Sequence, residues 1–250
     1  MVVSSNLTRP TNSPREAHLT ADRSELIGRA QAILRESLAP RLAASPLSGM
    51  ARWVETGSPP PAAELRAHGL TGPAAFDGPE AQALREVRKA FQRVWGFSIP
   101  CREAVEALRG LDHPLVEIGA GSGYWTALLR AAGLDIVATD LEAEGEGPYG
   151  SGLGRHALLE ALGGPQAVRA YPKRDVFCSW PSQGADWCAE AVREIAVGRA
   201  FALIGDLPGG VTATPALHEV LAERFDLETV VEIPQFPRVD DRLTIHRRVR

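Results

Sequence analysis

The chain has 250 residues and a formal net charge of −4, and its lysine and arginine residues form no basic cluster. This length accommodates one α/β domain with an additional segment. The acidic balance gives no support to a nucleic-acid partner, and no apolar run approaches the ~20 residues that a membrane-spanning helix needs. The N-terminus lacks the basic-then-apolar order of a signal peptide, and the three cysteines (Cys101, Cys178 and Cys188) lack metal-ligand spacing. We therefore expect a cytoplasmic protein with reduced thiols and no structural zinc.

The first part of the chain is expected to be helical, with no strand. Residues 1–20 are polar, contain two prolines and show no hydrophobic period, which predicts disorder. Residues 21–96 are predicted to form a helical cap, because apolar residues recur at helical spacing between segments rich in glycine and proline. The predicted helices of the cap cover residues 22–39, 46–54, 62–68 and 79–95.

Residues 97–250 are predicted to form a Rossmann-like α/β domain, and its best-defined part is a strand–turn–helix–strand unit. A capped helix over 97–111 precedes a short β-branched run that ends at Ile118. Three closely spaced glycines follow, then a helix over 124–132, and a second apolar run over 136–139 that ends on Asp140. Such a βαβ unit carries a nucleotide-type ligand site at the carboxyl ends of its strands.

The rest of the chain alternates helices and strands. A loop over 142–154 precedes a helix predicted over Arg155–Leu162 and a short helix at 166–169. The last two apolar runs are expected to pair in an antiparallel hairpin at the edge of the sheet. The remaining predicted elements are strands at 175–180 and 199–204, helices at 185–197 and 215–225, and the two edge strands at 227–233 and 243–247.

The spacing of the glycines distinguishes two kinds of nucleotide-binding turn. Dinucleotide-binding turns follow GxGxxG, whereas this chain has Gly119, Gly121 and Gly123 followed by the bulky Tyr124. Glu117 precedes the first glycine by two residues, which gives the pattern ExGxGxG. A simple flexible loop is the alternative, but the preceding strand, the following helix and Asp140 favour a ligand site.

This pattern is similar to motif I of the class I S-adenosylmethionine-dependent methyltransferases. The resemblance implies a doubly wound, mostly parallel, seven-stranded Rossmann-like sheet with an antiparallel C-terminal edge, and S-adenosylmethionine as the cofactor. It assigns Asp140 to the ribose hydroxyls and Glu117 to anchoring either the turn or the ammonium end of the cofactor. The full set of cofactor-binding residues that it implies is Glu117, Gly119, Ala120, Gly121, Gly123, Tyr124 and Asp140.

From residue 97 onward the chain also resembles a group of bacterial class I methyltransferase-like proteins. The matching segments are Phe97–Pro100, Glu117–Trp125, Asp140, Ser179–Pro181, and Ile233–Pro234 with Asp241–Leu243. Motif I is the specific match, and the other segments are weak individually.

Two positions depart from the methyltransferase pattern. Where the family has an acid for the adenine amino group after its third strand, this chain has Gly163-Gly164-Pro165, and Glu160 falls within the predicted helix. Where amino methyltransferases often have Asn/Asp-Pro-Pro-Tyr after the fourth strand, this chain has Ser179-Trp180-Pro181-Ser182-Gln183. We predict that residues 180–183 (Trp180, Pro181, Ser182 and Gln183) contact the substrate. Ser179 and Asp206, each at a strand end, are the predicted catalytic residues, with His218 and His246 as more remote candidates.

The main functional prediction is a methyltransferase that acts on the nitrogen or oxygen of a small molecule in bacterial secondary metabolism. The first alternative is a methyltransferase-fold enzyme that no longer transfers methyl. It would use Glu117 and Asp140 to bind or deprotonate an amine, for example for intramolecular ring closure. The second alternative is a non-catalytic partner subunit. A homodimer or a complex with a small partner subunit is compatible with each of these functions.

Overall fold

The computed structural model describes residues 36–72, 78–141, 155–206 and 208–250. The predicted disorder of residues 1–20, the first part of the helix predicted from Asp22 and the loop over 142–154 lie outside the described residues. Residues 36–43 are helical. The further helices are α2 (Met50–Thr56), α3 (Ala62–Arg66), α4 (Pro79–Val94), α5 (Arg102–Arg109), α6 (Tyr124–Ala131), α7 (Gly164–Ala170), α8 (Trp187–Glu194) and α9 (Pro215–Arg224). The strands are β1 (Leu115–Ile118), β2 (Ile136–Thr139), β3 (Asp175–Ser179), β4 (Ala200–Gly205), β5 (Phe225–Glu232) and β6 (Arg242–Arg248).

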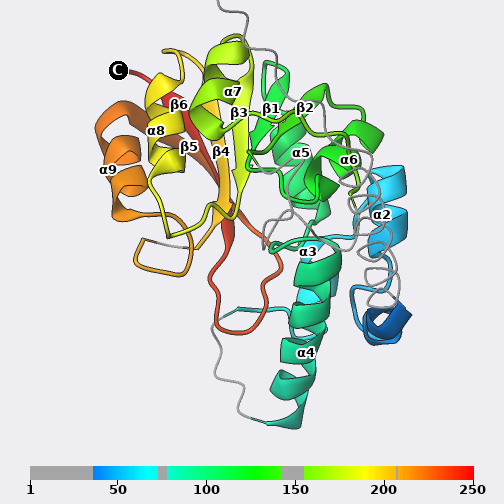
Figure 1. The fold of residues 1–250 in the computed structure, drawn as a ribbon. Helices are drawn as coiled ribbons and strands as arrows, with labels where there is room; N and C mark the ends of the chain where they lie inside the picture. The colour runs from blue at the N-terminus through cyan, green and yellow to red at the C-terminus, as the bar shows by residue number, and fades with distance from the viewer. Residues whose placement is uncertain (1–35, 73–77, 142–154, 207) are drawn as a thin grey trace, which may run out of the picture.

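The strands form one sheet in the order β2-β1-β3-β4-β6-β5 (Figure 1). The first four strands in this order are parallel, and β6 runs antiparallel to both β4 and β5. The predicted Rossmann-like sheet with an antiparallel C-terminal edge is therefore confirmed. The described residues form six strands, one fewer than predicted.

The segment over residues 155–162 explains two differences from the prediction: the helix predicted there is wrong, and only an isolated bridge lies beside β2. Residues 155–162 contain good helix formers but form no helix. Instead, Glu160 makes an isolated parallel bridge with Thr139, the last residue of β2. The backbone N–H of Glu160 donates to Ala138 O at 2.9 Å, and the N–H of Asp140 donates to Glu160 O at 3.0 Å. Pairing with the free edge of β2 outweighs local helix propensity here, because propensity is only a weak preference.

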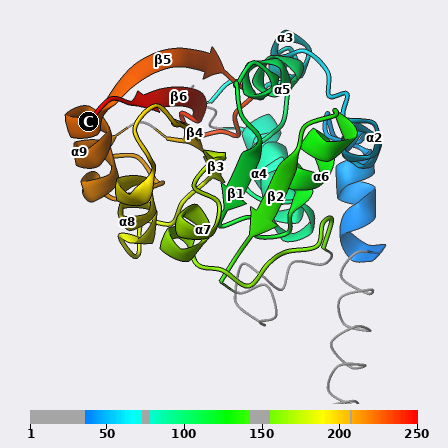
Figure 2. The same ribbon diagram turned by 90° about the horizontal axis from the view of Figure 1, so that it is seen from above.

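Helices cover both faces of the sheet, as Figures 1 and 2 show: α2, α5 and α6 lie on one side and α7, α8 and α9 on the other. The strands β1, β3 and β4 are buried on both faces, which explains their nearly continuous apolar sequences. Alternate residues of β1 enter different cores: Leu115 packs with α6, and Val116 and Ile118 pack with α7 and α8. Glu117 therefore shares its face with α6.

The helices that precede the sheet share its core. Leu47 and Met50 belong to the same buried cluster as Trp125 of α6 and Ile245 of β6. The long helix α4 extends past the carboxyl ends of the parallel strands, close to the β5–β6 connection (Figure 1). In the described ranges no helix has the length and apolarity to cross a bilayer.

Candidate functional site at the carboxyl edge of the sheet

The glycine turn joins β1 to α6 at the carboxyl edge of the sheet. Gly119, Gly121 and Gly123 have φ values of 66°, 57° and 74°, a region that other L-residues enter only at a cost. The backbone N–H of Ala120 donates to Thr139 O at 3.0 Å and so fastens the turn to the end of β2. The glycines are thus required by the backbone path between strand and helix.

Of the three glycines, Gly121 faces space that no other described residue fills. A Cβ at Gly119 would lie 2.7 Å from the ring of Trp187, and one at Gly123 would lie 3.0 Å from Ala157 Cβ. A Cβ at Gly121 would meet nothing within 4 Å among the described residues. Among the described residues, nothing therefore obstructs the approach of a ligand to the turn at Gly121.

Asp140 lies beside this opening. Its Oδ2 accepts the backbone N–H of Gly121 at 2.9 Å, and its side chain is partly exposed. The structure thus brings together two of the predicted cofactor-binding residues, Gly121 and Asp140. This arrangement suits a ligand with two neighbouring parts: hydroxyl groups that donate to the carboxylate, and a second group that lies against the backbone of the turn.

Glu117 lies beneath the turn rather than in the opening. It is 2 % exposed, and its Oε2 accepts the hydroxyl of Thr126 from α6 at 2.5 Å. Burial, together with the charge of Asp140, raises the pKa of Glu117 to about 8. Glu117 therefore joins β1 to α6 from a buried position.

Tyr124 is 4 % exposed, and its hydroxyl donates to Ser98 O at 2.5 Å. The Oγ of Ser98 lies 2.8 Å from Ser179 Oγ and accepts the indole N–H of Trp125 at 2.9 Å. This buried network connects the helix after the glycine turn to the end of β3. Ser179, predicted to be catalytic, is one of its members.

Trp180 follows β3 in a strained backbone conformation. Its φ is 60°, which costs about 1–2 kcal/mol for a residue with a side chain. The indole N–H donates to Asp241 Oδ2 at 2.9 Å, and the ring stacks on Phe97 at 5.0 Å between centroids. Observed strain held by several contacts is typical of functional sites.

The other predicted substrate contacts are hydrogen-bonded to other parts of the chain. Pro181 is buried, and its carbonyl accepts the backbone N–H of Ala213. Ser182 and Gln183 are exposed; Ser182 accepts the indole N–H of Trp187, and Gln183 donates to Gly210 O. These contacts order the loop after β3.

Asp206, directly after β4, accepts hydrogen bonds from two loops: the loop that follows β4 and the β5–β6 connection. Its Oδ1 accepts the N–H of Asp240 at 3.1 Å, and its Oδ2 accepts the N–H of Val211 at 3.0 Å. Both oxygens therefore have backbone donors, which suits a bracing role better than that of a base. His246 pairs with Phe201 near the start of β4, at the end of the strand opposite to Gly205.

Trp180 meets side chains that sequence reasoning did not bring together with it, and we call this group the aromatic–arginine cluster. Its members are Arg88, Phe97, Trp180, Phe236 and Asp241. The Arg88 guanidinium carbon lies 5.6 Å from the ring centroid of Trp180 and 6.0 Å from that of Phe236. Asp241 is 1 % exposed, and its Oδ1 has no hydrogen-bond partner in the described part of the chain. Burial raises the pKa of Asp241 to about 7.

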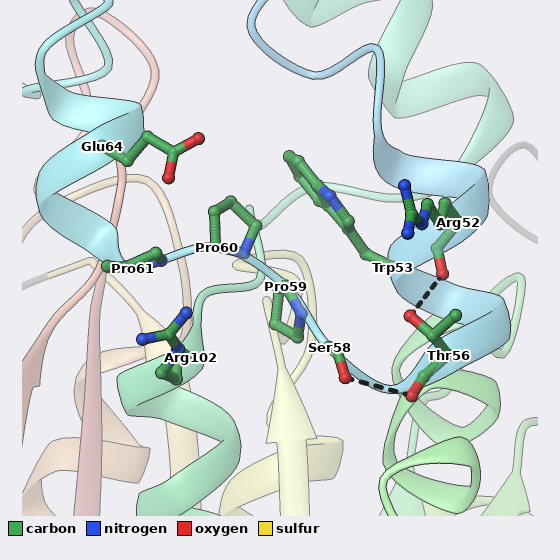
Figure 3. A pocket seen from close by; sticks show the side chains of 9 residues that line it. All are labelled: Arg52, Trp53, Thr56, Ser58, Pro59, Pro60, Pro61, Glu64 and Arg102. Atoms are coloured by element: carbon green, nitrogen blue, oxygen red, sulfur yellow. Dashed lines mark hydrogen bonds between the residues drawn. The ribbon is translucent and has the colours of Figure 1, made fainter.

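A separate surface cleft of about 420 Å³ lies among α2, the following proline-rich link and the start of α5 (Figure 3). Trp53, Pro59 and Arg102 are among its lining residues. None of the predicted site residues lines it.

The order of the strands, the reversed last strand and the glycine turn decide the architecture. The fold is Rossmann-like, with the reversed last strand that the resemblance to class I methyltransferases implies. No family model and no curated protein matches the sequence.

The chain is similar to solved methyltransferase structures. One is 1,6-didemethyltoxoflavin-N1-methyltransferase from Burkholderia thailandensis, with 17 % identity, a TM-score of 0.45 and coverage of 71 % of this chain and 93 % of that one. Another is magnesium protoporphyrin IX methyltransferase from Synechocystis, with 14 % identity, a TM-score of 0.43 and coverage of 70 % and 99 %. A third is the CcbJ methyltransferase from Streptomyces caelestis, with 12 % identity, a TM-score of 0.41 and coverage of 60 % and 89 %. Similarity at this level leaves activity to be argued from the residues.

Proposed function

We propose that the chain binds S-adenosylmethionine at Gly121 and Asp140 and transfers its methyl group to a small molecule. The observation that carries the proposal is the open glycine turn with Asp140 beside it. Asp140 would accept the ribose hydroxyls, and the unobstructed backbone at Gly121 would lie against the methionine part. When bound, this cofactor supplies an electrophilic methyl group on a sulfonium.

The residues of this chain would contribute mainly alignment. Methyl transfer is a one-step displacement that depends on the position of the nucleophile more than on acid–base catalysis. Trp180 lies at the end of β3, next to β1 in the sheet, and the Ser98 network joins Ser179 to the helix after the glycine turn. The acceptor is therefore assigned to the region of Trp180.

We assign a small-molecule acceptor to this site, with nitrogen or oxygen as the nucleophile, in bacterial secondary metabolism. The partly buried aromatic side chains at the end of β3 support a small acceptor with an apolar body. The resemblance of residues 97–250 to bacterial methyltransferase-like proteins supports the setting.

Titration calorimetry of the full chain with S-adenosylmethionine and S-adenosylhomocysteine tests the proposal. We expect Asp140→Ala to weaken binding at least about tenfold, because a charge-assisted hydrogen bond contributes roughly 1.5–3 kcal/mol. Asp226→Ala, at an exposed position of β5, is the matched control and should bind like the unmodified chain. Absence of binding to the unmodified protein would refute the proposal.

One observation favours the alternative in which methyl transfer is lost. Glu160, beside β2, is the nearest acid to the adenine position implied by the resemblance. Its carboxylate accepts the hydroxyl of Tyr171, with both oxygens 2.7 Å away. Both oxygens of Glu160 are thus engaged by Tyr171. Against the alternative, Glu117 is too deeply buried to act directly as the base that this function requires. Turnover of an amine without cofactor, abolished by Asp140→Ala, would favour the alternative.

A further inference from the structure

Arg88 has an unusual environment for a charged side chain. It projects from α4, is half-buried, and its guanidinium lies near the rings of Trp180 and Phe236. Within the described ranges, no hydrogen bond or ion pair holds it. Ring contacts use the face of a guanidinium and leave the N–H donors at its edge available.

Burial lowers the pKa of Arg88, while the charges of Asp241 and Asp206 oppose this effect. An arginine side chain nevertheless stays protonated in proteins. The five N–H donors of a partly dehydrated guanidinium therefore favour an oxygen acceptor, and a carboxylate matches their planar arrangement with two parallel hydrogen bonds. These donors are available to an anion.

The carboxylates near Arg88 are poorly placed to bind a cation instead. Asp206 is engaged by the backbone N–H groups of Asp240 and Val211, and Asp241 accepts the indole N–H of Trp180. The second oxygen of Asp241 is buried. Burial raises the pKa of the Asp241 carboxyl group to about 7, so this carboxyl group is partly protonated near neutral pH. The charge that a ligand meets in this cluster is therefore dominated by Arg88.

We propose that Arg88 binds the carboxylate of a planar, aromatic acceptor whose ring packs in the aromatic–arginine cluster. Trp180 is fixed for this contact by Asp241 on its N–H and by Phe97 on its ring. The proposal rests on the proposed function only in calling this ligand the methyl acceptor. Binding of the anion itself needs no cofactor.

The test uses three small probes of one shape with the full chain, in the absence of S-adenosylmethionine: benzoate, benzamide and benzylamine. Ligand-detected NMR and calorimetry should show binding of benzoate, at least about tenfold weaker binding of benzamide, and no binding of benzylamine. Arg88→Ala should weaken benzoate binding at least about tenfold, and Arg88→Lys should weaken it less. Arg93→Ala, at an exposed position of the same helix, should leave it unchanged.

Equal binding of benzoate and benzamide, preferred binding of benzylamine, or undiminished benzoate binding by Arg88→Ala would overturn the proposal. If Arg88→Ala does not fold, as judged by circular dichroism, Arg88→Lys and the three probes on the unmodified chain decide. Benzoate binding without S-adenosylmethionine binding would refute the proposed function and keep the anion site. The reverse result would refute the anion site alone.

Discussion

The glycine turn and the aromatic–arginine cluster lie at the same edge of the sheet but are built differently. The turn and its partners come from one continuous segment, residues 117–140, and their polar groups are paired: Glu117 with Thr126, and Gly121 with Asp140. The cluster joins Arg88 of α4 to Asp241 before β6, and it contains a guanidinium without a hydrogen bond and a carboxylate oxygen without a partner in the described chain. The named polar groups of the turn are paired with one another, whereas the cluster has donors and an acceptor oxygen that no described group engages.

The largest expected effect concerns the buried acid of the turn. Burial raises the pKa of Glu117 from 4.5 to about 8 in the folded state. Its contribution to stability is therefore full below pH 4.5 and is lost as the pH rises through 8. Between these limits the free energy of unfolding should fall by up to roughly 5 kcal/mol, at about 1.36 kcal/mol per pH unit. Glu117→Gln, which resembles the protonated acid, should remove this dependence.

Denaturant unfolding of both proteins at pH 5 and pH 9 measures the difference. Glu106→Gln, at an exposed position on α5, is the control and should keep the pH dependence of the unmodified chain. If Glu117→Gln loses as much stability between pH 5 and pH 9 as the unmodified chain does, Glu117 is ionised in the folded protein.

Asp241, the buried acid of the cluster, should also make the free energy of unfolding fall as the pH rises. The fall should be smaller than that from Glu117 and should end at a lower pH. Burial raises the pKa of Asp241 from 3.8 to about 7, so its contribution is full below pH 3.8 and is lost as the pH rises through 7. Asp241→Asn should reduce the fall in unfolding free energy between pH 5 and pH 8 by roughly 2–3 kcal/mol. The Asn side-chain carbonyl can still accept the N–H of Trp180. A double variant with Glu117→Gln should show additive effects, and strong non-additivity would mean that the two regions are coupled.

The same contrast explains what could be predicted from the sequence. The strands, the glycine turn and Asp140 follow from local spacing, because neighbouring residues in the chain make this part of the site. Arg88 and Asp241 lie more than 150 positions apart, and nothing near either residue in the sequence indicates that they meet at Trp180. The helix predicted over residues 155–162 was wrong for a related reason. This segment instead pairs with β2, which is distant from it in the sequence, and local helix propensity gives no sign of that pairing.

A third prediction concerns access to the turn. Gly121→Ala places a methyl group in the open space beside Asp140, and it should weaken S-adenosylmethionine binding about tenfold. Gly133→Ala is a matched control, because Gly133 also has a positive φ, 89°, and open space around its Cβ position, but it follows α6. Both variants should lose about 1 kcal/mol of stability from backbone strain. Equal weakening of binding by both would show that general destabilisation, and not obstruction at Gly121, is responsible.

The smallest expected effect separates the turn from the segment beside β2. Tyr171→Phe removes the hydroxyl that holds Glu160, at a stability cost below about 1 kcal/mol because the hydrogen bond is exposed. If the freed carboxylate can reach the adenine amino group, S-adenosylmethionine should bind a few-fold more tightly, and Glu160→Gln should cancel the gain. Calorimetry of the single and double variants measures both effects. Unchanged affinity in all of these variants would show that the turn and Asp140 bind the cofactor without help from Glu160. The cofactor site would then consist of residues from the 117–140 segment alone.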